Sequence, residues 1–400
     1  MPPKQVYQKI LQLLQETLTE GIDGRSLERL ALLVIGIIAA KHGAPAQIAK
    51  ALRTLRLSPA QAESLERRIR RLENDPEITA EICVHPFARW HLRYGKPQRL
   101  WLIVDATTQE DRLVMLTISV WYRGRALPLV WTIWEANTPL TGKRFWERVE
   151  GLLTVLEGLL PVQVPLIVMA DRAFGTPAFI DLVTRRGWQY IVRVQGQTRC
   201  CDRVGRVRRV LELAADKHQR GKMSGSVFKK AGWREANVVV YQGNCHQAPV
   251  CLVSNLPLDW RIYYYYRRRF GIEAGFRDYK SHGWEWEQGQ VKDLAHMERL
   301  LVGMALATWV ALCVGSQVAA ELLSKPPTGN RRTRPYEGKF SLFTLGLDRL
   351  KEWLMGALEC TPRWQLCDWE APNWETQIRN HHAFAFVFKC SRLATPSVRP

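Results

Sequence analysis

Three acidic residues stand in surroundings that suit metal-assisted chemistry. Asp105 and Asp171 each follow a continuous apolar run, in RLWLIVDAT and PLIVMAD, and Glu273 lies in the cationic stretch YYYYRRRFGIEAGFRDYK. With no nearby Cys or His as an obvious further ligand, they form an all-oxygen set that favours Mg²⁺ or Mn²⁺ over zinc. Two such ions about 4 Å apart assist in-line phosphodiester displacement, one by activating the nucleophile and the other by stabilising the leaving oxygen.

The stretch around Glu273, Tyr263–Lys280, predicts a helix with one functional face. At about 100° per residue, Tyr266, Arg269, Glu273 and Lys280 fall within roughly 60° of the helix circumference, along about 21 Å. On that face we expect Arg269 to hold phosphate through paired hydrogen bonds and Lys280 to hold it as a point charge.

Each feature also has a structural alternative. Tyr263–Lys280 alone is typical of a solvated cationic helix, and Gly271 and Gly275 either allow a close backbone approach or break the helix. Asp105 and Asp171 taken singly are typical of strand-ending turns or helix caps, Asp171 in DRAFGTP above all. Two aspartates at equivalent strand ends favour a metal site, because paired carboxylates are costly unless a cation lies between them.

The elements that must position these acids form a mixed α/β pattern. Apolar runs predict strands, and amphipathic stretches predict helices, in the order strand 99–105, strand 113–121, strand 127–134, helix 141–160, strand 165–170, helix 176–186 and strand 188–194, with a turn at 122–125. This order predicts a mixed sheet with flanking helices, whose first three strands form a meander. Ligands of such sheets gather at the carboxyl ends of strands. If the strands that end at Asp105 and Asp171 are parallel neighbours, we expect the two carboxylates to face each other.

The first 75 residues predict helices, over 6–18, 27–41 and 45–55 and after Ser58–Pro59. The last of these helices is basic, with Arg67, Arg68, Arg70 and Arg71, which is typical of a DNA-binding module. A solvated helix with salt bridges to Glu63, Glu66 and Glu73 explains this segment equally well. The stretch Asn74–Lys96 is interpreted as a connector.

A basic segment at 198–259 interrupts the pattern with two short predicted strands, 236–241 and 249–253. We interpret it as a β-rich insertion. Its aromatic residues Trp233 and Tyr241 are candidates for stacking on an unpaired base, although aromatic residues in short strands more often belong to a core. Beyond Lys280, the uncharged run 300–315 predicts a buried core helix rather than a membrane span. A basic linker at 325–335 and an amphipathic helix at 339–358 follow.

Composition limits the partners. Lys and Arg number 57 against 38 Asp and Glu, a net charge of +19 with a pI of about 9.8. Such a surplus favours a polyanion, nucleic acid before an anionic membrane. The nine cysteines show no CxxC spacing, which argues against a zinc site or a disulfide framework and for a reducing compartment. The N-terminus lacks a signal-peptide pattern, so we do not expect secretion.

These acids and the Tyr266-x2-Arg269-x3-Glu273-x6-Lys280 spacing resemble the DDE transposases of bacterial insertion sequences that carry the Tyr-Arg-Glu-Lys signature. The resemblance covers roughly residues 27–358, including KFSLFTLG at 339–346. It implies an RNase H-like core in which Asp105, Asp171 and Glu273 are the catalytic, metal-binding acids, with Mg²⁺ or Mn²⁺, in two ions, as cofactor. Tyr266, Arg269 and Lys280 are then DNA contacts.

The resemblance also implies cut-and-paste transposition. Family members bind terminal inverted repeats, pair two ends in an oligomer (a homodimer is expected here), free a 3′-hydroxyl and join it to target DNA. Many form a hairpin and hold a flipped base on an aromatic residue, for which Trp233 and Trp260 are candidates. The expected location is the prokaryotic cytoplasm, with no membrane partner. Alternatives are an RNase H-like nuclease without strand transfer and an inactive transposon-derived DNA-binding protein.

The expected organisation has five segments: a helical DNA-binding domain (1–75), the first part of the catalytic core (76–197), the insertion (198–259), the second part of the core with the glutamate helix (260–322) and a C-terminal helical or irregular region (323–400).

Overall fold

Two compact units make up the protein. The computed structural model describes residues 2–57, 61–72, 74–214, 220–243, 248–289, 291, 293–324 and 341–379. One unit, called here the sheet unit, comprises Pro97–Trp121 and Pro128–Gly275. The other, called the helical unit, comprises Met1–Lys96, Tyr122–Leu127 and Phe276–Pro400. All three candidate acids belong to the sheet unit, so their mutual geometry is a property of one compact body.

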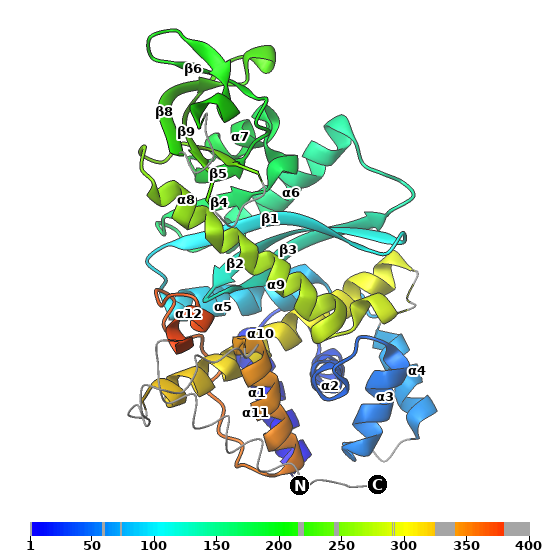
Figure 1. Cartoon of the computed structure of the whole chain (residues 1–400). Helices are drawn as coiled ribbons and strands as arrows, with labels where there is room; N and C mark the ends of the chain where they lie inside the picture. The colour runs from blue at the N-terminus through cyan, green and yellow to red at the C-terminus, as the bar shows by residue number, and fades with distance from the viewer. Residues whose placement is uncertain are drawn as a thin grey trace, which may run out of the picture. The chain divides into compact units, whose positions relative to one another are not determined.

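A ten-stranded mixed sheet organises the sheet unit (Figure 1). Across the sheet, the strands run in the order β3 (Arg125–Glu135), β2 (Leu113–Tyr122), β1 (Leu100–Gln109), β4 (Leu166–Ala170), β5 (Gln189–Arg193), β10 (Val250–Ser254), β9 (Arg234–Tyr241), β8 (Arg220–Val227), β6 (Arg199–Asp202) and β7 (Val207–Arg209). The central strands β1, β4 and β5 are parallel, and β1 pairs antiparallel with β2. The predicted mixed α/β sheet, with its opening meander, is confirmed.

Local chemistry explains the connections in the first half of the sheet. The turn between β2 and β3 contains Arg123 and Gly124, both with positive φ (47° and 101°), which suits a tight hairpin. Helix α6 (Gly142–Leu159) leads from β3 to β4, and α7 (Pro177–Thr184) leads from β4 to β5. The Thr176 side chain caps α7, whose first turn starts with proline. The crossover through α7 leaves the parallel strands β4 and β5 side by side, and β4 also pairs with β1.

The basic insertion continues the sheet rather than forming a separate one. Strand β10 pairs antiparallel with β5, and β9, β8, β6 and β7 follow in turn. The predicted strands at 236–241 and 249–253 are confirmed as β9 and β10. Strands β6, β7 and β8 were not predicted, because their sequences (RCCD, VRR and RGKMSGSV) are short or polar and lack an apolar run.

The helical unit contains the predicted N-terminal helices. Its elements are α1 (Pro2–Thr17), α2 (Gly24–Ala40), α3 (Pro45–Thr54), α4 (Ala62–Leu72), the π-turn η1 (Ala80–Val84), α5 (His85–Gly95), α10 (Leu294–Ser324), α11 (Leu342–Met355) and the short α12 (Trp374–Arg379). The connector expected at 74–96 is wrong: Thr79 caps a helical segment there, and Phe87, Ala88 and Leu92 of α5 are buried. The Ser58–Pro59 cap, Glu73 and the 325–335 linker lie outside the described residues.

Helix α10 forms the core of the helical unit. By length and composition it is the one described helix that could cross a membrane, or one of up to two spans if the bent pair α2–α3 is counted. Its apolar window is completely buried within the protein. This burial favours the predicted core helix.

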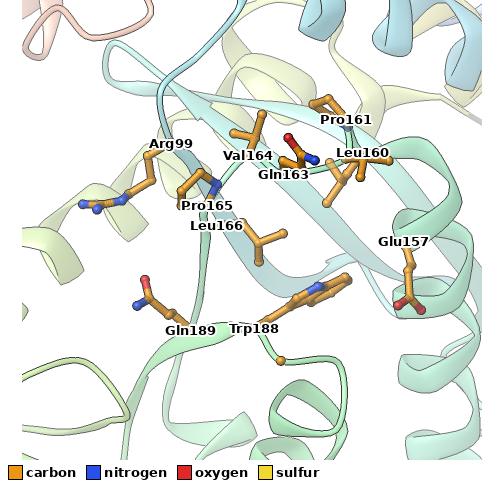
Figure 2. A pocket seen from close by; sticks show the side chains of 12 residues that line it. Arg99, Glu157, Leu160, Pro161, Gln163, Val164, Pro165, Leu166, Trp188 and Gln189 are labelled. Carbon is orange, nitrogen blue, oxygen red and sulfur yellow. The ribbon is translucent and has the colours of Figure 1, made fainter.

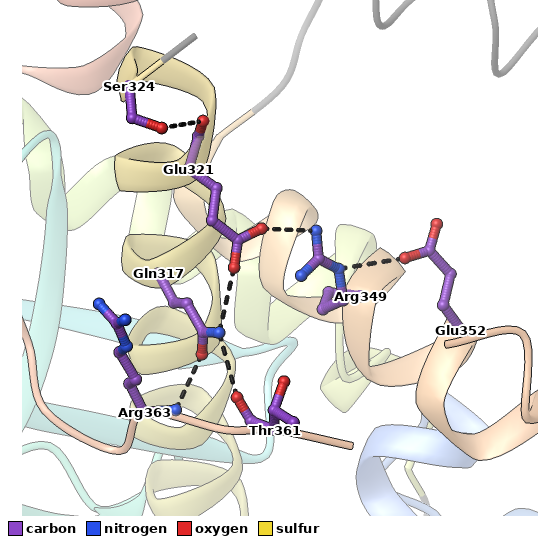
Figure 3. Close-up of polar contacts among 7 residues, drawn as sticks. All are labelled: Gln317, Glu321, Ser324, Arg349, Glu352, Thr361 and Arg363. Atoms are coloured by element: carbon purple, nitrogen blue, oxygen red, sulfur yellow. Dashed lines mark hydrogen bonds and ion pairs between the residues drawn. The ribbon is translucent and has the colours of Figure 1, made fainter. Parts of the chain in front are cut away.

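Helices α10 and α11 approach each other closely at two glycines. A Cβ atom at Gly315 would overlap the carbonyl of Leu342, and one at Gly346 would overlap the carbonyl of Ala311. Near the end of α10, polar side chains satisfy one another and the chain that follows α11 (Figure 3). Glu321 accepts hydrogen bonds from Gln317 (3.1 Å) and Arg349 (3.0 Å), and Gln317 also bonds to the backbone of Thr361 and Arg363.

Candidate active site

Asp105 and Asp171 lie beside each other on neighbouring parallel strands. The last parallel pair between β1 and β4 is Val104–Ala170, and the two aspartates are the next residue on each strand. Adjacent strands are about 4.8 Å apart, so the register puts both carboxylates at one edge of the parallel pair. The condition on which facing carboxylates were expected, that the two strands are parallel neighbours, is met.

One detail of that prediction is wrong. Strand β1 does not end at Asp105 but continues to Gln109, because β2 keeps pairing with it as far as Gln109–Leu113. Asp105 therefore lies within a strand, opposite Thr117 of β2, at the point where only the parallel partner β4 has ended.

Asp171 combines a structural role with its place in the site. One of its carboxylate oxygens, Oδ1, accepts a hydrogen bond from the backbone N–H of Ala173 (2.8 Å) and caps the 3₁₀ turn η2 (Arg172–Phe174). The helix-cap interpretation of DRAFGTP is therefore correct for this residue. It is compatible with a ligand role, because a carboxylate has two oxygens with several acceptor positions.

The segment that carries Glu273 is helical throughout but not uniform. It consists of α8 (Arg261–Tyr266), a 3₁₀ turn η5 (Arg267–Arg269), α9 (Phe270–Arg277) and a π-turn η6 (Asp278–His282). The expectation of one regular α-helix is therefore wrong, because the segment tightens before Glu273 and widens after it. The glycines that flank Glu273 do not break α9, and both are buried.

Arg269 links two of the acids directly. Its Nη1 donates to Oδ2 of Asp105 (2.9 Å), and its Nη2 donates to Oε1 of Glu273 (2.7 Å). The guanidinium also lies over the ring of Tyr266, 5.8 Å from its centroid. Arg269 is 8% exposed, whereas the Glu273 side chain is 52% exposed. From the sequence we expected Arg269 to bind phosphate and did not expect this bridge, although an Arg and a Glu four residues apart signal a helical ion pair.

Burial dominates the electrostatics of the site. It raises the pKa of Asp105 from its ordinary value near 3.8 to about 6, with further upward contributions from the charges of Asp171 and Glu273. Arg269 and the Ala106 N–H, which bonds to Asp105 Oδ1 at 2.9 Å, act in the opposite direction. Burial likewise raises the pKa of Tyr266 to about 12. The site is thus a partly dehydrated group of negative charges with one internal cation.

The donor set fits a divalent cation chemically. Asp105, Asp171 and Glu273 are all carboxylates; burial raises the pKa of Asp105, and the charges of Asp171 and Glu273 add to the rise. Oxygen donors with uncompensated negative charge suit Mg²⁺ or Mn²⁺. Within the described part of the chain, no three His, Cys, Asp or Glu side chains are already gathered closely enough to hold a metal ion. Arg269 bonds to both Asp105 and Glu273 at this place.

The other predicted DNA contacts differ in their surroundings. Lys280 lies in η6 of the helical unit, where it pairs with Glu287 (3.1 Å). Trp233, in the sheet unit, is 39% exposed. Trp260 is half-buried, with Lys222 Nζ 5.5 Å from its ring centroid, and the ring of Tyr241 stacks on Tyr263 at 3.9 Å.

A neighbouring residue missed by the sequence analysis anchors the helix to the sheet. The guanidinium carbon of Arg268 lies 4.2 Å from the ring centroid of Trp101 in β1, 5.1 Å from Trp121 in β2 and 5.5 Å from Tyr265. Trp101 and Asp105 are four residues apart on β1 and therefore point to the same face of the sheet. This contact holds Arg269 against the face on which Asp105 lies. The only signal in the sequence was the tyrosine–arginine run itself.

A basic groove lies among the N-terminal helices. It has a volume of about 350 Å³ and is lined by residues of α2, α3 and α4, including Arg25, Arg29, Arg68 and Arg71. Arg70 instead pairs with Glu66 along α4 (2.8 Å), as the salt-bridge interpretation of that helix expected. The DNA-binding role of residues 1–75 stays a prediction.

A larger pocket lies at the wrong end of the sheet for this chemistry. With a volume of about 650 Å³, it is lined by residues such as Arg99, Leu166 and Gln189 (Figure 2). These residues lie where β1, β4 and β5 begin. Asp105 and Asp171 lie towards the opposite, carboxyl ends of the same parallel strands. The pocket is therefore separate from the candidate active site.

Comparison with known proteins agrees with this geometry. Residues 148–310 match a protein family described as "Transposase DDE domain". The matched region contains Asp171 and Glu273, whereas Asp105 lies outside it. No curated protein matches the chain. The chain thus carries a region similar to the transposase DDE domain, on a mixed α/β fold consistent with that of RNase H-like transposases.

Proposed function

We propose that this protein is a DNA transposase that cuts transposon ends and joins them to target DNA. The observation that carries the proposal is the in-register position of Asp105 and Asp171, with Glu273 tied to Asp105 through Arg269. The family match over residues 148–310 supports it independently, since it rests on sequence and not on this geometry. The net charge of +19 suits a nucleic-acid substrate.

In this proposal Asp105, Asp171 and Glu273 hold the divalent cations, Mg²⁺ or Mn²⁺. When bound, such ions activate the attacking water or 3′-hydroxyl and stabilise the leaving oxygen. The protein holds the carboxylates on a rigid parallel strand pair and on a helix anchored by Arg268. Tyr266, Arg269 and Lys280 are the proposed DNA contacts.

The class of transposase that we propose follows from the Tyr-Arg-Glu-Lys spacing. We propose that the protein is a transposase of a bacterial insertion sequence, acts on terminal inverted repeats as a homodimer in the prokaryotic cytoplasm, and follows the cut-and-paste route. For a flipped base, the exposure of Trp233 favours it over Trp260, whose ring already contacts Lys222. The N-terminal helices are the proposed end-recognition domain.

The test is strand cleavage on duplexes that carry the DNA flanking the gene. With Mg²⁺, we expect the wild-type protein to nick these duplexes, and Asp105→Asn, Asp171→Asn or Glu273→Gln to lose the activity by at least about a hundredfold. Asp181→Asn is the matched control, because Asp181 is a sheet-unit carboxylate paired with Arg234 away from these acids. Full activity in any one of the three site variants would refute the assignment of the acids.

The same assay separates the alternatives. Joining of the cleaved end to a target plasmid distinguishes a transposase from a nuclease that only cleaves. Binding of the flanking DNA without any nicking by the wild-type protein would identify an inactive DNA-binding protein.

A further inference from the structure

Both carboxylate oxygens of Asp105 already accept a hydrogen bond. Oδ1 accepts a hydrogen bond from the N–H of Ala106 (2.9 Å), and Oδ2 accepts one from Arg269 (2.9 Å). The backbone bond is fixed by the strand, whereas the guanidinium belongs to a side chain with rotatable bonds. Of the two bonds, the one to Arg269 is therefore the one that can be exchanged.

Arg269 engages the acids in the way a cation would. It uses separate N–H groups for the two carboxylates, so a single positive charge is shared between Asp105 and Glu273. It is largely withdrawn from water, at 8% exposure. Buried like charges that lack a counter-ion are costly. Without a metal ion, the site therefore needs an internal positive charge, and Arg269 supplies it.

We propose that Arg269 is an exchangeable counter-ion, which occupies the metal-binding carboxylates in the metal-free protein and must leave Asp105 before a divalent cation can bind there. This inference rests on the proposed function for the metal role of the acids. It also reconciles two roles of one side chain, because a guanidinium that is bonded to two carboxylates and only 8% exposed presents little surface to a DNA phosphate. Arg269 therefore contacts DNA only after it has left the acids.

A competing explanation predicts the opposite change in metal affinity when Arg269 is removed. If Arg269 were a permanent brace that holds Asp105 and Glu273 in the geometry for a metal ion, its removal would weaken metal binding. If it is an exchangeable counter-ion, its removal frees Oδ2 of Asp105 and leaves the negative charges uncompensated, so metal binding becomes tighter.

The experiment measures Mn²⁺ binding by the full-length, DNA-free protein after removal of metals with a chelator. Electron paramagnetic resonance counts the unbound Mn²⁺, so the readout does not depend on catalysis. We expect Arg269→Gln to bind Mn²⁺ about tenfold more tightly than the wild-type protein, because a charge-assisted pair no longer has to be broken. Unchanged or weaker binding by a folded Arg269→Gln protein would overturn the proposal.

Two further variants serve as controls for this experiment. Arg234→Gln removes a guanidinium that is likewise paired with a carboxylate, Asp181, elsewhere in the sheet unit. It should bind Mn²⁺ like the wild type, and an equal gain there would overturn the proposal by tracing the effect to total charge. If Arg269→Gln does not fold, Arg269→Lys decides. Lysine has one ammonium in place of the two-pronged guanidinium, so tighter binding than wild type supports exchange, and equal or weaker binding overturns it.

The acid variants separate this inference from the proposed function. Asp105→Asn should reduce Mn²⁺ binding by at least about tenfold. If it binds Mn²⁺ as the wild type does, the metal site itself is refuted. If it loses Mn²⁺ while Arg269→Gln gains nothing, the site stands and only the exchange is refuted.

Discussion

Asp105→Asn should make the metal-free protein more stable. The folded protein holds the Asp105 carboxyl in a buried place that raises its pKa from about 3.8 to about 6, so folding favours the protonated form. Above pH 6 the folded site must nevertheless carry the charge, and this lowers the stability. Asparagine has nearly the same shape without the charge, and its one carbonyl oxygen can accept one of the two hydrogen bonds that Asp105 accepts from Arg269 and the Ala106 N–H.

The magnitude follows from the linkage between protonation and folding. Between pH 3.8 and 6 the unfolded chain has released this proton and the folded chain has kept it, so stability falls as the pH rises. A shift of about two pKa units corresponds to a loss of about 3 kcal/mol at pH 8 and about 1.6 kcal/mol at pH 5. The attraction of Arg269 is already contained in that shift. For a domain of this size, 3 kcal/mol corresponds to a rise in melting temperature of roughly 6–12 °C, and the one hydrogen bond that asparagine cannot accept subtracts about 1 kcal/mol from this gain.

The assay is thermal unfolding of the wild-type protein and of Asp105→Asn at pH 5 and pH 8, both in the presence of a chelator. We expect the variant to melt higher at both values and the difference to grow with pH. Asp181→Asn is the control of opposite sign, because Arg234 lowers the pKa of Asp181 and the ionised carboxylate therefore contributes stability at pH 8. An Asp105→Asn protein no more stable than wild type at pH 8, or a difference independent of pH, would refute this account of the site.

Two further predictions concern the helical unit. Gly315→Ala or Gly346→Ala should destabilise this unit by about 1–3 kcal/mol and lower its melting temperature, because the added methyl group meets the backbone of the facing helix. Gly158→Ala is the control, because Gly158 on α6 faces open space and its substitution should not lower the melting temperature. Equal effects of all three substitutions in thermal unfolding would contradict the packing argument. Lys280→Gln should weaken binding of the flanking DNA duplex and make the binding affinity less dependent on salt concentration, while the Mn²⁺ affinity stays unchanged. Fluorescence anisotropy measures this binding, and a salt dependence equal to that of the wild type would show that Lys280 is not a DNA contact.

The part of the site built on strands followed from the sequence. The runs that precede Asp105 and Asp171 are apolar at every position, which is typical of strands covered on both faces. The sequence predicted that the aspartates meet at one edge only on the condition that these strands are parallel neighbours, since β2, β3 and α6 separate β1 from β4 along the chain. The end of β1 was not predictable in the same way. It depends on how far β2 continues to pair, and the polar residues of β1 after Asp105 gave no sign of that pairing.

The part built on the helix was less predictable, because a helical wheel assumes one constant turn angle. The 3₁₀ turn at Arg267–Arg269 and the π-turn at Asp278–His282 both depart from that angle. Over the four residues from Arg269 to Glu273 the departure is small, and the predicted shared face is realised as an ion pair. Over the eleven residues from Arg269 to Lys280 the departures add up, and Lys280 lies within the π-turn, where it pairs with Glu287. Predictions from a helical wheel therefore become less accurate as the distance along the chain increases.

The spacing of Arg269 and Glu273 also illustrates why residue types alone did not fix the role of the arginine. Within a cationic helix, an arginine one turn before a glutamate is equally compatible with two roles, a phosphate contact and an ion-pair partner. What decides between them in the metal-free protein is burial, because a carboxylate as enclosed as Asp105 stabilises the nearest cation far more than an exposed phosphate contact would. That same burial raises the pKa of Asp105 and makes it destabilising when charged. The burial of Asp105 thus explains both the bridge formed by Arg269 and the stability that Asp105→Asn should restore. The Mn²⁺-binding and unfolding experiments therefore test the effect of this burial independently.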